Sequence, residues 1–282
     1  MIDEIKIYSP KSDLAEPLKL LRSMMQGLNA SRELSWRLAI RDISAQYRQS
    51  FLGVFWALII PFTNTLIWLF LSSSNVLKVA DTSLPYPVYV FSGSLLWSIL
   101  IESLIAPLQQ VERNREMISK MYFPRESIIL SGIYQTLFNA FIKIGILIIA
   151  LPFFKIHPNI TGIFIPLGIL SLILAGTVIG LIFTPIGILY QDVGRGIPLI
   201  SQFLMYLSPV VYPLSTNGIL GKIMTINPLT PLIINARAWF TGEPNQYLTS
   251  WFVSNLFFLV LGFFLWTIFR LAMPILIERM SA

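Results

Sequence analysis

The sequence predicts an all-α integral membrane protein with six transmembrane helices, an N-terminal amphipathic interface helix and two short re-entrant outer helices. Of its 282 residues, 55% are hydrophobic and 12% are charged, whereas soluble domains are usually about a quarter charged. Six stretches approach the roughly 20 apolar residues that cross a bilayer. The chain has no cysteine, which excludes disulfides and thiolate metal sites.

The first 50 residues form a cytoplasmic region that ends in the predicted interface helix, at about 31–50. Four apolar residues recur at steps of four, three and four, which places them on one helix face: Trp36, Ile40, Ile43 and Tyr47. The neighbouring face carries Arg37, Arg41, Ser44 and Arg48. Such a helix lies at the membrane surface, with its arginines facing phosphates or a soluble partner. A net charge of +6 suits contact with anionic lipid or with an acidic partner surface.

A transmembrane domain is predicted over 51–275, followed by a cytoplasmic tail at 276–282. Its spans are expected near 51–72, 86–108, 128–151, 164–189, 197–214 and 250–273. The fifth span is short and contains Pro209 and Pro213, so it either crosses fully or re-enters. Fifteen lysines and arginines fall on one side of these spans and four on the other. This asymmetry predicts that both termini are cytoplasmic and that the number of spans is even.

The segment from 214 to 249 contains two apolar runs that Asn227-Pro228 separates. Each run is too short to cross a bilayer. We expect two short helices that dip into the outer leaflet, which requires protein to shield them from lipid. A helical hairpin lying on the outer surface is the alternative.

Residues that carry chemistry are sparse, and no catalytic or metal-binding set is predicted. His157 stands alone beside Pro158, as expected for a solvated loop. Glu102 and Lys143 are the ionisable residues inside clear spans. Their depths are expected to differ by roughly 14 Å, so no pairing between them is predicted. No phosphate-binding loop is present, so any energy from ATP must come through another polypeptide.

The loop between the second and third spans, at 111–127, is predicted to be a rigid cytoplasmic knob that docks on such a partner. Pro124 ends its helix. Its charged residues are Glu112, Arg113, Arg115, Glu116 and Lys120. Its apolar residues are Met117, Met121, Tyr122 and Phe123. An ordinary positive-inside loop is the alternative interpretation.

Four blocks in order resemble the permease subunits of bacterial ABC exporters of the ABC-2 class. They are RDISAQYRQSFLGVFWALIIPF, KMYFPRESI, LYQDVGRGIPLISQFLMYLSPVVYP, and INPLTP followed by WFTGEPN. Within this class the chain, over about 31–275, is similar to the group that exports undecaprenyl-linked polysaccharides such as O-antigen, capsule-type polysaccharide and wall teichoic acid. The chain departs from the pattern at Gln191-Asp192, where Arg-Asp is usual, which leaves Arg195 as the candidate cation.

The resemblance implies a homodimer of six-span permeases in the inner membrane, joined to two copies of a separate ATPase that binds ATP and Mg²⁺. No cofactor on this chain and no nucleic-acid partner are expected. From the resemblance and the charged surfaces together, the predicted ATPase interface comprises Arg37, Arg41, Asp42, Tyr47, Arg48, Glu112, Arg115, Lys120, Phe123, Pro124 and Arg125.

Aromatic residues in the first and fifth spans are candidates for a translocation path. Aromatic rings offer large contact areas at low entropy cost, and they can pack on the C–H faces of sugars while leaving the hydroxyls free. The candidates are Phe55, Trp56, Phe62, Phe203 and Tyr206. The alternative is that these side chains simply face lipid, where aromatic residues are common.

The sequence therefore predicts the channel-forming permease of an ATP-driven exporter of a lipid-linked polysaccharide. Two alternatives stay open. One is an exporter of the same class that carries a drug, a lipid or another small molecule. The other is a membrane-embedded glycosyl- or acyltransferase, for which the predicted outer side offers only Asp81 and Glu243 as acids.

Overall fold

The computed structural model describes residues 17–48, 51, 53–74, 82, 84–120, 124–156, 159–214 and 218–281. Within these residues every regular element is a helix, which confirms the all-α prediction. The elements are α1 (Pro17–Arg48), η2 (Gly53–Phe55), α2 (Trp56–Ser73), α3 (Tyr86–Arg113), α4 (Arg115–Lys120), α5 (Glu126–Ala150), η3 (Leu151–Phe154), η4 (Ile160–Phe164), α6 (Ile165–Leu189), α7 (Gln191–Tyr206), α8 (Gly218–Ile226), α9 (Leu229–Thr241) and α10 (Leu248–Ser281).

In the described part of the chain, four helical stretches are long and apolar enough to cross a bilayer. They are Tyr86–Arg113, Glu126–Phe154, Ile160–Leu189 and Leu248–Arg279. The pair α8 and α9, bent by 82°, makes a fifth if it is one broken span. Because α2 has 18 residues and α7 has 16, the count of six spans stays a prediction.

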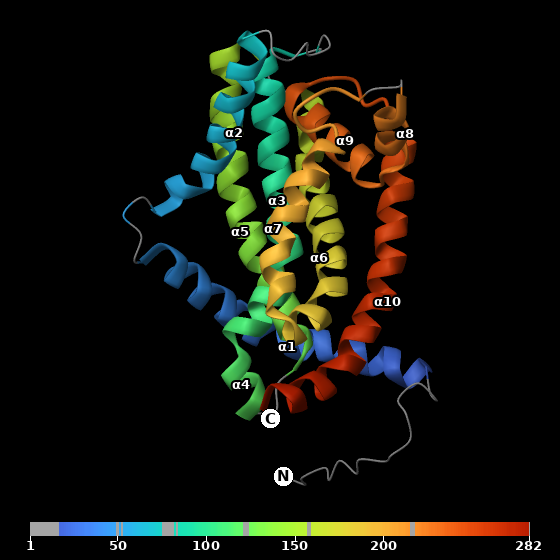
Figure 1. Cartoon of the computed structure of the whole chain (residues 1–282). Coiled ribbons are helices and arrows are strands. Elements are labelled where there is room, and N and C mark those ends of the chain that lie inside the picture. Colours follow the sequence, from blue (N-terminus) through green and yellow to red (C-terminus); the bar gives the residue numbers. More distant parts are fainter. Residues whose placement is uncertain are drawn as a thin grey trace.

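Helix α3 lies at the centre of the bundle, against α5 and α6 (Figure 1). Two glycines one turn apart on α6 let its backbone approach that of α3. A methyl group added at Gly176 would lie 2.4 Å from the Leu100 carbonyl oxygen, and one at Gly180 would lie 2.2 Å from that of Leu104. Small residues allow this kind of close helix packing inside membranes.

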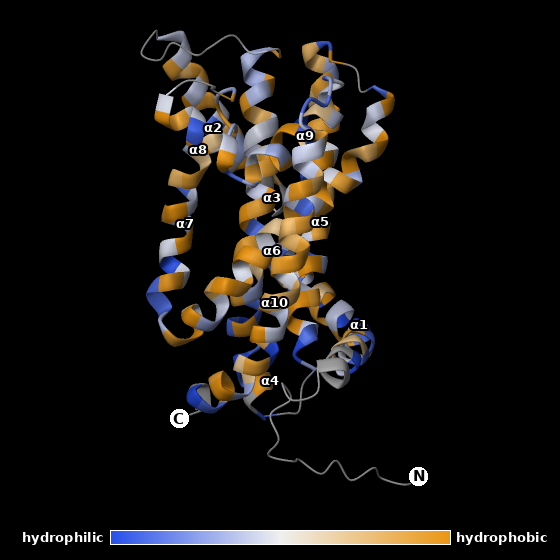
Figure 2. Cartoon of the chain, turned by 90° about the vertical axis from the view of Figure 1, so that its right-hand side faces the viewer, coloured by the Kyte–Doolittle hydropathy of each residue, from blue (hydrophilic) through white to orange (hydrophobic). Residues whose placement is uncertain are grey.

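Different helices lie at the two ends of the bundle. Helices α1 and α4 and the last turns of α10 lie together at one end, and α8 and α9 lie at the other (Figure 1). Hydrophobic residues cover the middle of the bundle, whereas hydrophilic residues gather along α1 (Figure 2). This grouping agrees with the predicted division of sides, and the orientation in a membrane stays a prediction.

The break between α8 and α9 falls at Asn227-Pro228, as expected. The Asn227 amide donates to the Leu207 carbonyl at 3.2 Å and to Ser208 Oγ at 3.0 Å, and its Oδ1 accepts from the Leu229 N–H at 3.0 Å. Every residue of α9 except Ile234 is buried. Protein therefore shields α9, whereas Ile219 and Ile226 of α8 are 81% and 82% exposed. The prediction of two shielded dipping helices thus stays a prediction.

Candidate functional site

Helix α1 packs against α5 through a stripe of small and polar residues. Ser31, Ser35 and Ala39 are fully buried at steps of four. The two serine hydroxyls donate to the carbonyls four residues earlier, so they need no outside partner. A methyl group at Gly27 would lie 3.0 Å from the Glu126 carboxyl. The backbone of α1 therefore lies close to α5 along this packing face.

The apolar stripe predicted on α1 lies mostly outside this packing face. Trp36 is 57% exposed and Ile40 is 46% exposed. The Trp36 ring meets the edge of Tyr134 at 5.9 Å between centroids. An exposed apolar stripe beside an arginine face suits the predicted position at a membrane surface.

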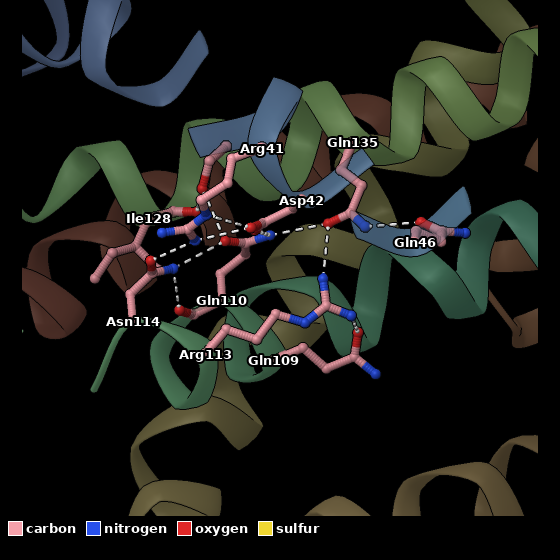
Figure 3. Close-up of polar contacts among 10 residues, drawn as sticks. Arg41, Asp42, Gln46, Gln109, Gln110, Arg113, Asn114, Ile128 and Gln135 are labelled. Atoms are coloured by element: carbon pink, nitrogen blue, oxygen red, sulfur yellow. Dashed lines mark hydrogen bonds and ion pairs between the residues drawn. The ribbon is translucent and has the colours of Figure 1, made fainter. Parts of the chain in front are cut away.

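A buried polar network, the α1–α3–α5 network, joins the three helices named in it (Figure 3). Arg41 donates twice to Asp42 Oδ1, at 2.8 and 2.7 Å, and once to Asn114 Oδ1 at 2.8 Å. Gln110 donates to Asp42 Oδ2 at 3.0 Å and to Gln135 Oε1 at 2.9 Å. Because Asp42 is only 6% exposed, these donors replace the water that its carboxylate loses.

The same network includes further side chains of α1, α3 and α5. Gln135 donates to Gln46 Oε1 at 3.0 Å, which returns the chain of bonds to α1. Arg113 donates to Gln135 Oε1 at 3.3 Å. Ser131 donates to Gln110 Oε1 at 3.2 Å. Every polar side chain here has a partner, and satisfied networks of this kind rigidify what they join.

A second linkage connects the start of α5 with α10 and α4. Arg270 donates to Glu126 Oε1 at 2.7 Å, and Arg125 donates to the Arg270 carbonyl at 2.7 Å. Ile118 of α4 is buried in one apolar cluster with Phe269 and Met273 of α10. Helix α4 is therefore attached to the bundle rather than projecting freely.

The predicted ATPase contacts fall into two groups. Those with exposed side chains are Arg37, Arg41, Arg48, Glu112, Arg115 and Lys120, of which Arg41 is also bonded to Asp42 and Asn114. The side chains of Asp42, Tyr47 and Arg125 are bonded within the chain, to Arg41 and Gln110, to Asn139, and to Arg270. Pro124 is half-buried, and Phe123 lies outside the described residues. An ATPase contact at any of these positions stays a prediction.

A groove of about 460 Å³ lies beside the exposed group, between α3–α4 and α6–α7. It is lined by Gln109, Glu112, Arg115, Gln191 and Arg195, among others. The unusual Gln191 and the candidate cation Arg195 therefore share one groove with two predicted ATPase contacts.

The path candidates lie largely on the outside of the single chain. The exposed fractions are 67% for Phe55, 54% for Trp56, 54% for Phe62 and 71% for Phe203. Tyr206 is half-buried and packs on Trp68 at 5.9 Å between ring centroids. This contact joins Tyr206 of α7 to the second half of α2.

The prediction that Glu102 and Lys143 do not pair is wrong. Lys143 Nζ lies 2.7 Å from Glu102 Oε2. Gly132 of α5 faces Ala106 and Gln110 of α3, and counting outward from that crossing leaves Lys143 only about 8 Å beyond Glu102. A flexible lysine side chain spans this distance. The sequence-based depths started from span ends that the structure places elsewhere, since α3 continues to Arg113.

The amides that complete these networks were not predicted from the sequence. Gln135, Asn139 and Lys143 are spaced by four, which places them on one face of α5. Polar residues at helical spacing inside a predicted span were the available signal. His157 lies outside the described residues. Within the described residues no group of three or more metal-ligating side chains occurs.

Comparison with known proteins identifies the class of this membrane protein. Residues 33–241 match the family model of the ABC-2 type transporter. The chain therefore belongs to the ABC-2 type transporter family, whose members are membrane subunits of transporters. The match runs from within α1 to the end of α9, so it includes the α1–α3–α5 network.

Three curated relatives show which proteins the chain resembles. Two proteins from Klebsiella pneumoniae, each named O-antigen export system permease protein RfbA, are 24% and 25% identical over 79% of this chain and 86% of their own length. A protein of the same name from Myxococcus xanthus is 22% identical over 79% of this chain and 84% of its own length.

Proposed function

We propose that this chain is the permease subunit of an ATP-driven exporter that carries a lipid-linked polysaccharide of the O-antigen type across the bacterial inner membrane. The observation that carries the proposal is the likeness to three O-antigen export permeases over 79% of the chain. In this proposal two copies of the chain form the path, two copies of a separate ATPase bind ATP and Mg²⁺, and both termini are cytoplasmic.

The end of the bundle that holds α1 and α4 supports the motor side of the proposal. Exposed cations on both helices offer a docking surface, including Arg48 and Lys120. Behind them, Asp42 and Gln46 of α1 accept hydrogen bonds from Gln110 of α3 and Gln135 of α5. Ile118 of α4 is buried in one apolar cluster with residues of α10. A partner that displaces α1 or α4 would therefore move α3, α5 and α10 with it rather than tear these contacts.

The exposed aromatic residues of α2 and α7 support the path side. Four of the five path candidates are more than half exposed in the single chain. A second copy that faces α2 and α7 would enclose these rings between the two chains. Repeated weak aromatic contacts would then let a polymer slide.

A charge reversal with a matched control tests the docking half. Arg48→Glu combined with Lys120→Glu is expected to lower co-purification of the ATPase by at least tenfold and to reduce surface polysaccharide in parallel. The control is Lys222→Glu, an exposed lysine on α8 at the opposite end of the bundle. Equal co-purification in the double variant and the control would contradict the docking surface.

A deletion strain tests the cargo. Loss of the chain is expected to remove the surface glycan and to accumulate lipid-linked glycan inside the cell. Normal surface glycan together with impaired efflux of a small molecule would instead favour an exporter of small cargo. Product formation by the purified chain without any ATPase would favour a transferase.

A further inference from the structure

A polar chamber opens within the bundle, at the junction of α1 with α2. Its volume is about 380 Å³, and it is lined by Gln46, Tyr47, Gly53, Trp56, Glu102, Asn139 and Lys143. These residues come from η2 and from four helices that meet here, α1, α2, α3 and α5. The volume falls within the range of small-molecule sites in proteins, about 300–1,000 Å³.

The chamber contains the ion pair of Glu102 and Lys143, whose side chains are 28% and 8% exposed. Asn139 donates its amide to Glu102, and Tyr47 donates its hydroxyl to Asn139 Oδ1 at 2.9 Å. Charged side chains inside a membrane are costly and usually mark a functional pathway. These two are placed on the wall of a cavity, where a polar ligand can reach them.

Tyr47 joins the chamber to the interface helix. Burial, followed by the negative charge of Glu102, raises the pKa of its hydroxyl above the usual 10. The hydroxyl therefore stays protonated at physiological pH and keeps donating to Asn139. Whatever occupies the chamber contacts the last turn of α1 as well as the bundle.

The charge of the chamber restricts its occupant. Among the seven lining residues, the one cation and the one anion neutralise each other at 2.7 Å. A phosphate or a metal ion would have to break that pair, whereas a neutral molecule would not. A carboxylate accepts about four hydrogen bonds and an ammonium donates three, so both groups keep capacity for hydroxyls. Trp56, 54% exposed, adds an aromatic face for C–H groups.

We propose that the chamber binds a sugar unit of the exported glycan as it enters the path, which rests on the function proposed above. Trp56 packs on the C–H face of the sugar ring, and Glu102, Asn139 and Lys143 bond its hydroxyls. The site includes one of the aromatic path candidates, Trp56, and adds to its ring an ion pair and an amide in one cavity.

Trp56 offers the cleanest test, since its side chain is exposed and can be removed without unpairing a buried charge. In the intact permease–ATPase complex, Trp56→Ala is expected to lower the initial rate of glycan export about 3- to 10-fold, and Trp56→Tyr to restore most of it. The matched control is Phe70→Ala, a 71% exposed aromatic at the other end of α2. Export by Trp56→Ala at the wild-type rate would overturn the inference.

A labelling experiment measures occupancy directly. Because the chain has no cysteine, Gln46→Cys and Phe70→Cys each introduce a single thiol. The probe is the oligosaccharide repeat released by mild acid from the glycan of the host strain. It is expected to slow maleimide labelling of Gln46→Cys and to leave Phe70→Cys unchanged. Labelling of Gln46→Cys that does not respond to the oligosaccharide, as when a lipid headgroup fills the chamber, overturns the inference.

The two proposals fail in different ways. If the wild-type complex exports no glycan, the proposed function is wrong. If the wild-type complex exports glycan while Trp56→Ala matches it and the oligosaccharide protects no thiol, only the sugar-binding chamber is wrong.

Discussion

Each end of the bundle buries a charged side chain, and the two side chains differ in their hydrogen bonds. Asp42, at the α1 end, accepts two hydrogen bonds from Arg41 and one from Gln110. Arg237, at the α9 end, is 2% exposed and donates one hydrogen bond, to the Val210 carbonyl at 2.9 Å. Its guanidinium carbon lies 3.8 Å from the centroid of the Tyr89 ring, and its Nε has no hydrogen-bond partner in the part of the chain that the structure describes.

The buried charge at the α1 end is held by several side-chain hydrogen bonds, whereas the buried charge at the α9 end is held mainly by close packing. At the α9 end, other buried polar atoms also lack hydrogen-bond partners among the described residues, including Thr230 Oγ1, Asn235 Oδ1 and Trp251 Nε1. Unpartnered buried groups make a closed arrangement less stable. The α1 end is therefore suited to transmit a displacement, whereas the α9 end needs less free energy to rearrange.

The largest expected effect tests the close packing at the α9 end. Gly93→Ala would put a methyl group 2.2 Å from the Val210 carbonyl oxygen and 2.3 Å from Arg237 Nη2. Because a backbone carbonyl cannot move away cheaply, we expect a loss of about 3 kcal/mol in the free energy of unfolding in mixed micelles. Gly145→Ala is the control, since nothing lies within 4 Å of its added methyl group. Equal stability of the two variants would contradict packing by shape.

The second prediction concerns the bonded end. Asp42→Ala leaves Arg41 and Gln110 without their acceptor, and we expect a loss of about 2 kcal/mol, since Arg41 is half exposed and water replaces part of the pair. Glu33→Ala on the same helix breaks an exposed pair with Arg37 and should change the stability by less than about 0.5 kcal/mol. A similar result for both variants would mean that the network does not bind α1 to the bundle.

The smallest effect is expected at the buried arginine. Arg237→Met loses the bond to Val210 and the contact with Tyr89, but it also removes the cost of burying a cation with a single hydrogen-bond partner. We expect a net change within about 1 kcal/mol. A loss larger than that of Asp42→Ala, measured in the same micelles, would reverse the comparison between the two ends.

The sequence predicted where the helices lie along the chain better than it predicted which helices contact one another. The break at Asn227-Pro228 and the span over 250–273 correspond to observed features, because proline and apolar runs act locally. Helix α1 nevertheless begins at Pro17, well before residue 31, and α10 continues through Pro274 to Ser281. The extension of α10 packs on α4, since Met273 shares an apolar cluster with Ile118, and periodicity does not contain such a contact.

The candidate site shows the same division. Its exposed charges, such as Arg48 and Lys120, were found from sequence, since charge patterns mark surfaces. Its buried partners were not, because the α1–α3–α5 network joins residues 68 and 25 positions apart, as in Asp42 with Gln110 and Gln110 with Gln135. Long separations of this kind are not encoded by local spacing.

By itself, the sequence determined that this is a helical membrane protein, because apolar stretches in lipid must satisfy their own backbone and therefore become helices. Only the tertiary structure decided that Lys143 reaches Glu102 and that Asp42 is buried. The physical reason is register. Close contacts at Gly132, Gly176 and Gly180 set how far one helix slides along the next, and that offset decides which polar groups meet.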